Sequence, residues 1–177
     1  LGPHDGELRV YAPGAQRVDA LDAGGARTAL REQGQGLFLG RVAHARAGDA
    51  SSYRLAIQWP GAEQVTADPY AFGPLLNEET LEQLAQGSWR DAGTALGARL
   101  MAVDGVAGLR CAVWAPNAQR VAVVGDFNAW DSRRHGMRLR HRAGVWEIFI
   151  PGVRAGERYT FAITDRAGNQ RLKADPL

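Results

Sequence analysis

The stretch Tyr11-Ala12-Pro13-Gly14-Ala15-Gln16-Arg17-Val18 returns 103 positions later as Trp114-Ala115-Pro116-Asn117-Ala118-Gln119-Arg120-Val121. Two further landmarks follow in the same order: Tyr53-Arg54-Leu55 is answered by Tyr159-Thr160-Phe161, and Ala67-Asp68-Pro69 by Ala174-Asp175-Pro176. Self-similarity at a nearly fixed spacing indicates a duplicated structural unit. The sequence therefore predicts two copies of one module of about 65–70 residues.

The second copy divides into short apolar stretches separated by turn residues. Strands are predicted over 109–114, 120–124, 145–150, 159–164 and 170–174. In the stretch 159–164 large and small side chains alternate with a period of two, which is typical of a strand buried on one face. Many short antiparallel strands with regular turns predict a β-sandwich for each copy, and hence an all-β fold class.

A short helix is predicted between the two copies. Asn77 can cap it, Glu78 and Glu79 suit its first turn, and Gly87 suits its end. A hairpin with an Asp104-Gly105 turn follows. These signals predict a first module over 1–72, a helical linker over 73–94 and a second module over 95–177. We expect Phe72 and Trp89 to pin the helix to a module.

The composition excludes several classes of protein. Hydrophobic residues make up 45% of the 177 residues and charged residues 23%, which is the balance of a folded chain rather than a disordered one. The net charge of +2 gives no electrostatic reason to expect nucleic acid or membrane as a partner. No apolar run is long enough to span a bilayer and no signal peptide precedes the first strand, so we expect a cytoplasmic location. The first residue, Leu1, and the ending at Leu177 suggest a fragment of a longer chain.

No catalytic pattern is visible in the chain. It has neither a serine elbow nor a zinc-binding His-Glu-x-x-His, and it lacks a phosphate loop. The four histidines (His4, His44, His135 and His141) show no metal-ligand spacing to one another or to the single Cys111, so they are expected in turns or at the surface. We therefore expect no catalytic residue, no metal and no cofactor in these residues.

The sharpest candidate for binding is the stretch Gly125-Asp126-Phe127-Asn128-Ala129-Trp130-Asp131, directly after a predicted strand. A Trp in so polar a turn is expected to be partly exposed, and an exposed indole offers a flat apolar plate to the C–H face of a glucose ring. Asn128 and Asp126 could bond the sugar hydroxyls, as an oriented ligand site requires. The alternative is that Trp130 folds back over the sandwich edge. Residues 18–25 of the first copy carry no aromatic residue.

The other aromatic residues favour a structural role. Tyr11 and Trp114 stand at matching strand ends and are expected in the core, as is Trp146 with Ile148 and Ile150. The basic cluster at 133–142 could meet an anion, a nucleic acid or an acidic partner surface, but its alternation with Met137 and Leu139 favours a solvated strand face.

Taken together, the motifs resemble the N-terminal region of bacterial 1,4-α-glucan (glycogen) branching enzymes. Residues 113–118, 123–130 and 172–176 are similar to their carbohydrate-binding module of family forty-eight, and residues 1–4 and 68–72 to their extra N-terminal module. The resemblance implies two immunoglobulin-like sandwiches, followed by an amylase-type catalytic barrel that these 177 residues do not contain. It also implies that Trp130 stacks on glycan with Asn128 beside it.

Three functions follow as hypotheses. The first is a non-catalytic part of a branching enzyme of glycogen biosynthesis, with α-1,4-glucan or glycogen and the barrel of the same parent chain as partners. Whether the protein as a whole is an enzyme depends on that barrel. The second is a pair of purely structural modules without useful glycan binding. The third is a glycogen-targeting adaptor.

Overall fold

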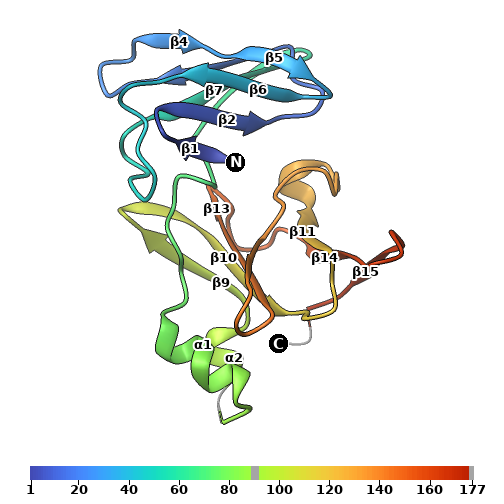
Figure 1. Ribbon diagram of the computed structural model, residues 1–177. Coiled ribbons are helices and arrows are strands. Elements are labelled where there is room, and N and C mark those ends of the chain that lie inside the picture. The colour runs from blue at the N-terminus through green and yellow to red at the C-terminus, as the bar shows by residue number, and fades with distance from the viewer. Residues whose placement is uncertain (89–91, 176–177) are drawn as a thin grey trace. The chain divides into compact units, whose positions relative to one another are not determined.

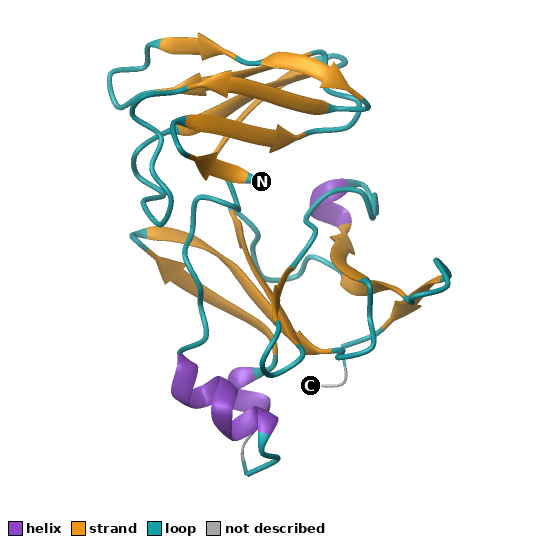
Figure 2. Cartoon of the chain, viewed as in Figure 1, coloured by secondary structure: helices purple, strands orange, loops and turns teal. Residues whose placement is uncertain are grey.

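The structure, a computed structural model, describes residues 1–88 and 92–175, with the backbone alone at Ala92. Its chain divides into two compact units (Figure 1). Unit 1 consists of Leu1–Gly73 with Val103–Val106, and unit 2 of Pro74–Ala102 with Ala107–Leu177. Strands dominate both units, with helix only in unit 2 (Figure 2). In the described part of the chain, the helices are too short or too polar to cross a membrane.

Unit 1 is built from two four-stranded antiparallel sheets. One has the order β1-β2-β6-β5 and the other β4-β3-β7-β8. Side chains from both sheets are buried between them, among them Leu8, Phe38 and Val18. The strands are β1 (Gly2–His4), β2 (Glu7–Tyr11), β3 (Arg17–Leu21), β4 (Arg27–Ala29), β5 (Arg31–Gly34), β6 (Leu37–Arg41), β7 (Arg54–Trp59) and β8 (Ala62–Thr66).

Unit 2 repeats this plan with one sheet of four strands and one of three. The first sheet has the order β12-β13-β10-β9 and the second β11-β14-β15. Cys111 and Ile148 from the first sheet and Val123 and Phe161 from the second are buried. The strands are β9 (Gly97–Val103), β10 (Val106–Trp114), β11 (Arg120–Gly125), β12 (Arg138–Arg140), β13 (Val145–Pro151), β14 (Tyr159–Thr164) and β15 (Gln170–Lys173).

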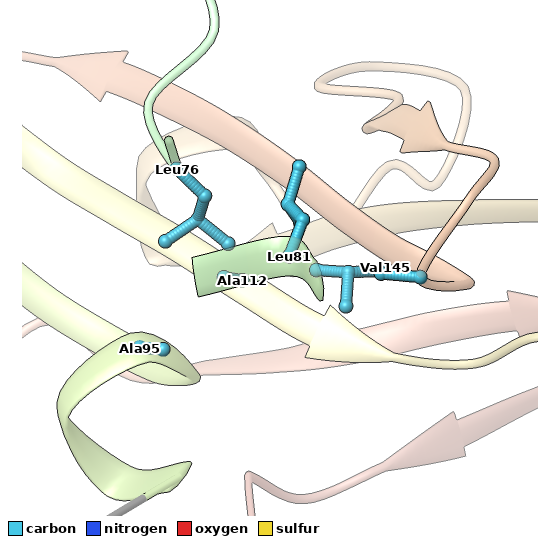
Figure 3. Close-up of a cluster of buried hydrophobic side chains, with 6 residues drawn as sticks. Leu76, Leu81, Ala95, Ala112 and Val145 are labelled. Carbon is cyan, nitrogen blue, oxygen red and sulfur yellow. The ribbon is translucent and has the colours of Figure 1, made fainter. Parts of the chain in front are cut away.

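A helix covers the outer face of the four-stranded sheet of unit 2. Helix α1 (Glu78–Ala85) begins where the Asn77 side chain accepts a hydrogen bond from the Thr80 amide. A second, four-residue helix, α2 (Ala92–Ala95), follows. Figure 3 shows the apolar cluster that holds these segments on the sheet. Its members are the buried residues Leu76, Leu81, Ala95, Ala112, Ala143 and Val145.

Glu147 on β13 binds the segment that leads into α1. Its side chain is 1% exposed, and its Oε2 accepts hydrogen bonds from the Leu75 and Leu76 amides at 3.2 and 2.9 Å. Its Oε1 accepts a hydrogen bond from Nη1 of Arg140 at 2.8 Å. Arg140 also pairs with Glu78 and donates to the Leu76 carbonyl. The start of α1 is therefore fixed to the sheet by buried charge as well as by apolar packing.

The internal repeat of the sequence is matched by repeated contacts. Tyr53 donates to the Asp68 carboxylate at 2.6 Å in unit 1, and Tyr159 donates to Asp175 at 2.5 Å in unit 2. After the matching strands, the Ala12 amide donates to the Gly36 carbonyl and the Ala115 amide to the Gly144 carbonyl. The repeated residues therefore make matching hydrogen bonds at equivalent turns and strands of the two units.

The structure confirms the predicted fold class: an all-β chain with two β-sandwich modules and a short helix at the predicted Asn77 cap. Trp146 is buried as predicted, at 6% exposure, whereas the prediction that Trp114 is a core residue is wrong because its side chain is 60% exposed. Trp114 shares a face of β10 with Ala112, away from the sandwich interior, and stands at the strand's end. Trp89 lies outside the described residues. The module boundaries stay a prediction.

Candidate functional site

The loop that carries Trp130 leaves β11 and returns to the same strand. It begins with a 3-10 turn over Asp126–Asn128. At its end the His135 carbonyl accepts a hydrogen bond from the Val123 amide at 3.2 Å, and the Met137 amide donates to the Val121 carbonyl at 2.8 Å. Because both ends are tied to β11, the loop is a closed structure on the edge of the sandwich.

The sharp exit from β11 requires the glycine at position 125. A Cβ there would lie 2.4 Å from the Arg158 carbonyl oxygen and 2.8 Å from the Phe127 ring. The Asp126 amide donates to that same carbonyl at 3.1 Å. The close approach of the two chains brings Arg158, at the end of the loop before β14, beside the start of the Trp130 loop.

The loop holds its aromatic residue in a strained backbone conformation. Ala129 and Trp130 have φ angles of 55° and 60°, the left-handed region that residues with a side chain rarely adopt. Such residues cost on the order of 1–3 kcal/mol each and persist where surrounding bonds enforce them. Here the Trp130 amide donates to the Gly125 carbonyl at 3.1 Å, which enforces the turn. Backbone strain of this kind clusters at functional sites.

Asn128 is the internal brace of the loop. Its side chain is 1% exposed; its Oδ1 accepts from the Gly125 amide at 2.9 Å and its Nδ2 donates to the Val123 carbonyl at 2.8 Å. Nδ2 also lies 2.9 Å from Nδ1 of His135. Desolvation lowers the pKa of His135 to about 3, with a smaller effect from Arg134, so the ring is neutral at pH 7. A neutral ring can accept the second Nδ2 hydrogen at Nδ1.

Trp130 lies at the surface of the loop that Asn128 holds in place, and it is 43% exposed. Its Nε1 donates to Oδ1 of Asp126 at 3.1 Å. Asp126 in turn accepts Nε and Nη2 of Arg158, each at 3.1 Å. The Arg158 guanidinium lowers the pKa of the Asp126 carboxyl, which is therefore ionised at neutral pH. The chain of bonds from Arg158 through Asp126 fixes the edge of the indole.

This geometry gives an aromatic plate with polar groups at one edge. The indole is oriented before any ligand arrives, and the Arg158 side chain beside it is 80% exposed. An apolar surface combined with a few convergent polar groups is the arrangement that binds and orients a small ligand. The site can therefore take a flat, partly apolar ligand that carries hydrogen-bonding groups on its rim.

The structure places the three predicted site residues in one loop but gives them different surroundings. Trp130 and Asp126 lie at the surface, and Asn128 is buried with both amide hydrogens directed at protein atoms. Their contact with a ligand stays a prediction. Arg158 was missed because it is 32 residues from Asp126 in the sequence and no motif marks it.

The basic cluster at 133–142 is divided among several protein partners. The expectation of a solvated strand face is wrong for Arg140, which is 12% exposed and pairs with Glu147 and Glu78. Arg133 pairs with Asp131, and Arg142 with Glu82 of α1. Over the described ranges, 1–88 and 92–175, no group of three His, Cys, Asp or Glu residues is arranged to hold a metal ion.

Residues 95–177 match the family of carbohydrate-binding module 48, the isoamylase N-terminal domain. The whole chain is 51% identical to part of a 1,4-alpha-glucan branching enzyme from Pseudomonas fluorescens and covers 24% of its length. For the branching enzyme of Bordetella pertussis the identity is 53% over the whole chain, with 25% of that enzyme covered. This chain resembles the N-terminal region of 1,4-alpha-glucan branching enzymes.

The chain spans about a quarter of the length of the branching enzymes that it matches. Trp130 lies in the part similar to carbohydrate-binding module 48. Among solved structures, a pullulanase complexed with maltotetraose from Anoxybacillus sp. LM18-11 aligns with a TM-score of 0.39 at 16% identity, covering 96% of this chain and 22% of the pullulanase.

Proposed function

We propose that this chain is a non-catalytic part of a cytoplasmic 1,4-α-glucan branching enzyme and that unit 2 binds α-1,4-glucan chains at Trp130. The observation that carries the proposal is the exposed indole held by Asp126 and Arg158 in a strained, closed loop. The similarity of residues 95–177 to carbohydrate-binding module 48 supports it independently. The remaining partner in this proposal is a catalytic barrel of the same parent chain.

Each residue of the site has a distinct role in the proposal. The face of the Trp130 indole stacks on the C–H face of a glucose ring, and the exposed Arg158 guanidinium donates to a hydroxyl. Asp126 orients the indole and accepts a hydrogen bond from a sugar hydroxyl at its outer rim. Asn128 acts through the loop: it holds Gly125 and His135 in place, so that the indole stays exposed.

The expected affinity is low. Stacking on one ring contributes roughly 1–3 kcal/mol, borrowing the range measured for bases on aromatic side chains. A Kd of 1 mM corresponds to about 4 kcal/mol. One platform with one or two hydrogen bonds thus gives a high-micromolar to millimolar Kd. On glycogen, where many chain ends lie close together, effective concentration makes such a weak site useful.

Titration with maltoheptaose tests the proposal, with the indole Nε1–H signal of Trp130 as the NMR probe. We expect this signal to shift with saturation in the wild type and the binding to this loop to be lost in Trp130→Ala. Leu100→Ala removes another exposed apolar side chain of unit 2, at 48% exposure, and serves as the matched control with unchanged binding.

The Asp126→Asn variant tests whether the Trp130 indole must be held in its orientation for glucan to bind, or need only be present. The variant keeps a side chain of the same size but loses the charge that holds Arg158, so we expect weaker binding with Trp130 still in place. A silent Trp130 signal in the wild type, together with unfolding of unit 2 in Trp130→Ala, would instead make Trp130 a structural plug. The purely structural hypothesis would then hold.

A further inference from the structure

Trp114 ends β10 with 60% of its side chain exposed, more than any other large hydrophobic residue that the structure describes. Scattered exposed apolar residues are ordinary on a protein surface, but a large indole at this exposure beside a hollow is not explained by packing. The neighbouring Ala112 on the same face of β10 is fully buried under α1. Trp114 therefore stands where the cover supplied by the helix ends.

The hollow beside Trp114 is a cavity of about 420 Å³ within unit 2. Small-ligand sites fall in the range of roughly 300–1,000 Å³. None of residues 125–131, the loop of Trp130, lines it, so it is a separate place on the unit. The lining residues include Trp114 at the end of β10 and Pro116 just after it, Leu139 of β12, His141 and Arg142 in the turn after β12, and Arg166 in the turn after β14.

The walls of the cavity are fixed in advance by contacts within the protein. The Ala115 amide donates to the Gly144 carbonyl at 3.0 Å, and Nε1 of the buried Trp146 donates to the Ala115 carbonyl at 3.0 Å. Gly144 has a φ angle of 64°, and a Cβ there would lie 2.6 Å from Cβ of Pro116. The turn after Trp114 therefore packs directly on Gly144.

The wall formed by α1 is also held in place. Leu81 of the helix is buried in the apolar cluster of unit 2 and Leu84 packs against that cluster, while Nη1 of Arg142 also lies 2.8 Å from Oε1 of Glu82. A site whose walls are already ordered loses little conformational entropy when a ligand binds. The cavity is therefore preorganised, and little of a ligand's binding free energy would be lost to ordering its walls.

The chemistry of the lining selects the class of ligand. Trp114, Pro116 and Leu139 supply apolar surface, while His141, Arg142 and Arg166 place hydrogen-bond donors at the exposed rim. Of the described residues that line the cavity, none is acidic, so a cationic ligand gains no partner there. Hydroxyl oxygens accept hydrogen bonds from guanidinium groups, and the C–H face of a sugar ring fits an indole.

We propose that the cavity beside Trp114 is a second contact for an α-1,4-glucan chain, separate from the Trp130 loop. The inference rests on the proposed function, because it takes the same ligand class. The proposal gives unit 2 two exposed aromatic residues that contact glucan, Trp114 and Trp130, instead of one. The matching residue of unit 1, Tyr11, is partly buried, so unit 1 offers no equally exposed aromatic residue at this place.

The test is a titration of the whole chain with maltoheptaose, read separately at the two places by NMR. The Trp114 indole Nε1–H and the Gly144 amide report on the cavity, and the Trp130 indole reports on the loop. We expect saturable shifts at the cavity signals. Trp114→Ala should raise the Kd measured at Gly144 by roughly 5- to 150-fold, the loss of one stacking contact, while the Kd read at Trp130 stays the same.

Two further variants test whether a loss of binding in Trp114→Ala comes from the missing indole or from a disturbed fold. Trp114→Gln keeps a long side chain at the strand end and is expected to lose cavity binding with an unchanged spectrum of β13. Leu100→Ala is expected to bind at both places like the wild type.

Cavity signals that stay still while the Trp130 signal shifts would overturn this inference and leave the proposed function standing. Cavity shifts that persist with unchanged Kd in both Trp114 variants would overturn it as well. Shifts of the cavity signals without a shift of the Trp130 signal would support this inference and would refute glucan binding at Trp130.

Discussion

Replacing Glu147 by Gln tests how unit 2 holds its helix, because it removes one charge from a buried network and keeps the shape of the side chain. In the wild type the carboxylate is 1% exposed, accepts the Leu75 and Leu76 amides and pairs with Arg140. The amide oxygen of a Gln can still accept the two backbone hydrogens. Its NH₂ group would then face the Arg140 guanidinium, where a donor meets a donor.

The magnitude follows from the burial of the pair. Breaking a buried ion pair by removing one partner costs about 3–5 kcal/mol, because a charge is left without compensation. Arg140 retains Glu78 and the Leu76 carbonyl, so we expect the lower end, about 3 kcal/mol. A domain of this size is stable by only about 5–15 kcal/mol, so the loss will be large.

Urea unfolding, followed by the NMR signals of unit 2, measures this loss. The matched control is Glu82→Gln, which breaks the exposed pair between α1 and Arg142, with side chains 44% and 67% exposed. Exposed pairs contribute about 0–1 kcal/mol, so this control should be nearly neutral. Equal small losses in the two variants would refute the claim that buried charge anchors the segment before α1.

Three further results are expected. Gly125→Ala should destabilise unit 2 by about 1–3 kcal/mol in urea, because its Cβ would meet the Arg158 carbonyl, whereas Gly73→Ala, with open space around it, should be tolerated; equal stabilities would contradict this. The pKa of His135 is lowered to about 3 in the folded chain against 6.5 when unfolded, so the unfolded state takes up the proton first and stability falls as the pH drops below 6.5. Between pH 7 and pH 5 the wild type should lose about 2 kcal/mol more than His135→Asn, and parallel pH profiles would show that His135 is not buried neutral. Asn128→Ala should weaken maltoheptaose binding at the Trp130 loop and lower stability together, since it leaves the Gly125 amide without its partner; an unchanged Kd would place Asn128 outside the support of the site.

The sequence by itself determined the duplicated all-β plan and the position of the helix. The repeat of Tyr11–Val18 at Trp114–Val121 carries Ala-Pro turns that end matching strands, and local signals of this kind need no distant partner to be recognised. The cap at Asn77 and the Asp104-Gly105 turn are likewise encoded within a few residues. The same local reasoning identified the loop of Trp130 and its partial exposure.

Only the tertiary structure decided which faces of the strands are covered. Alternation along β13 puts Trp146 and Glu147 on opposite faces of the sheet, yet both are buried because the segment before α1 covers the second face. The same cover stops short of Trp114, which is exposed although it ends a strand of the core sheet. Arg158 meets Asp126 through strand pairing across 32 residues. The alternation of residues along the sequence shows that a segment is a strand. It does not show how many layers pack on that strand, because those layers are formed by segments elsewhere in the chain.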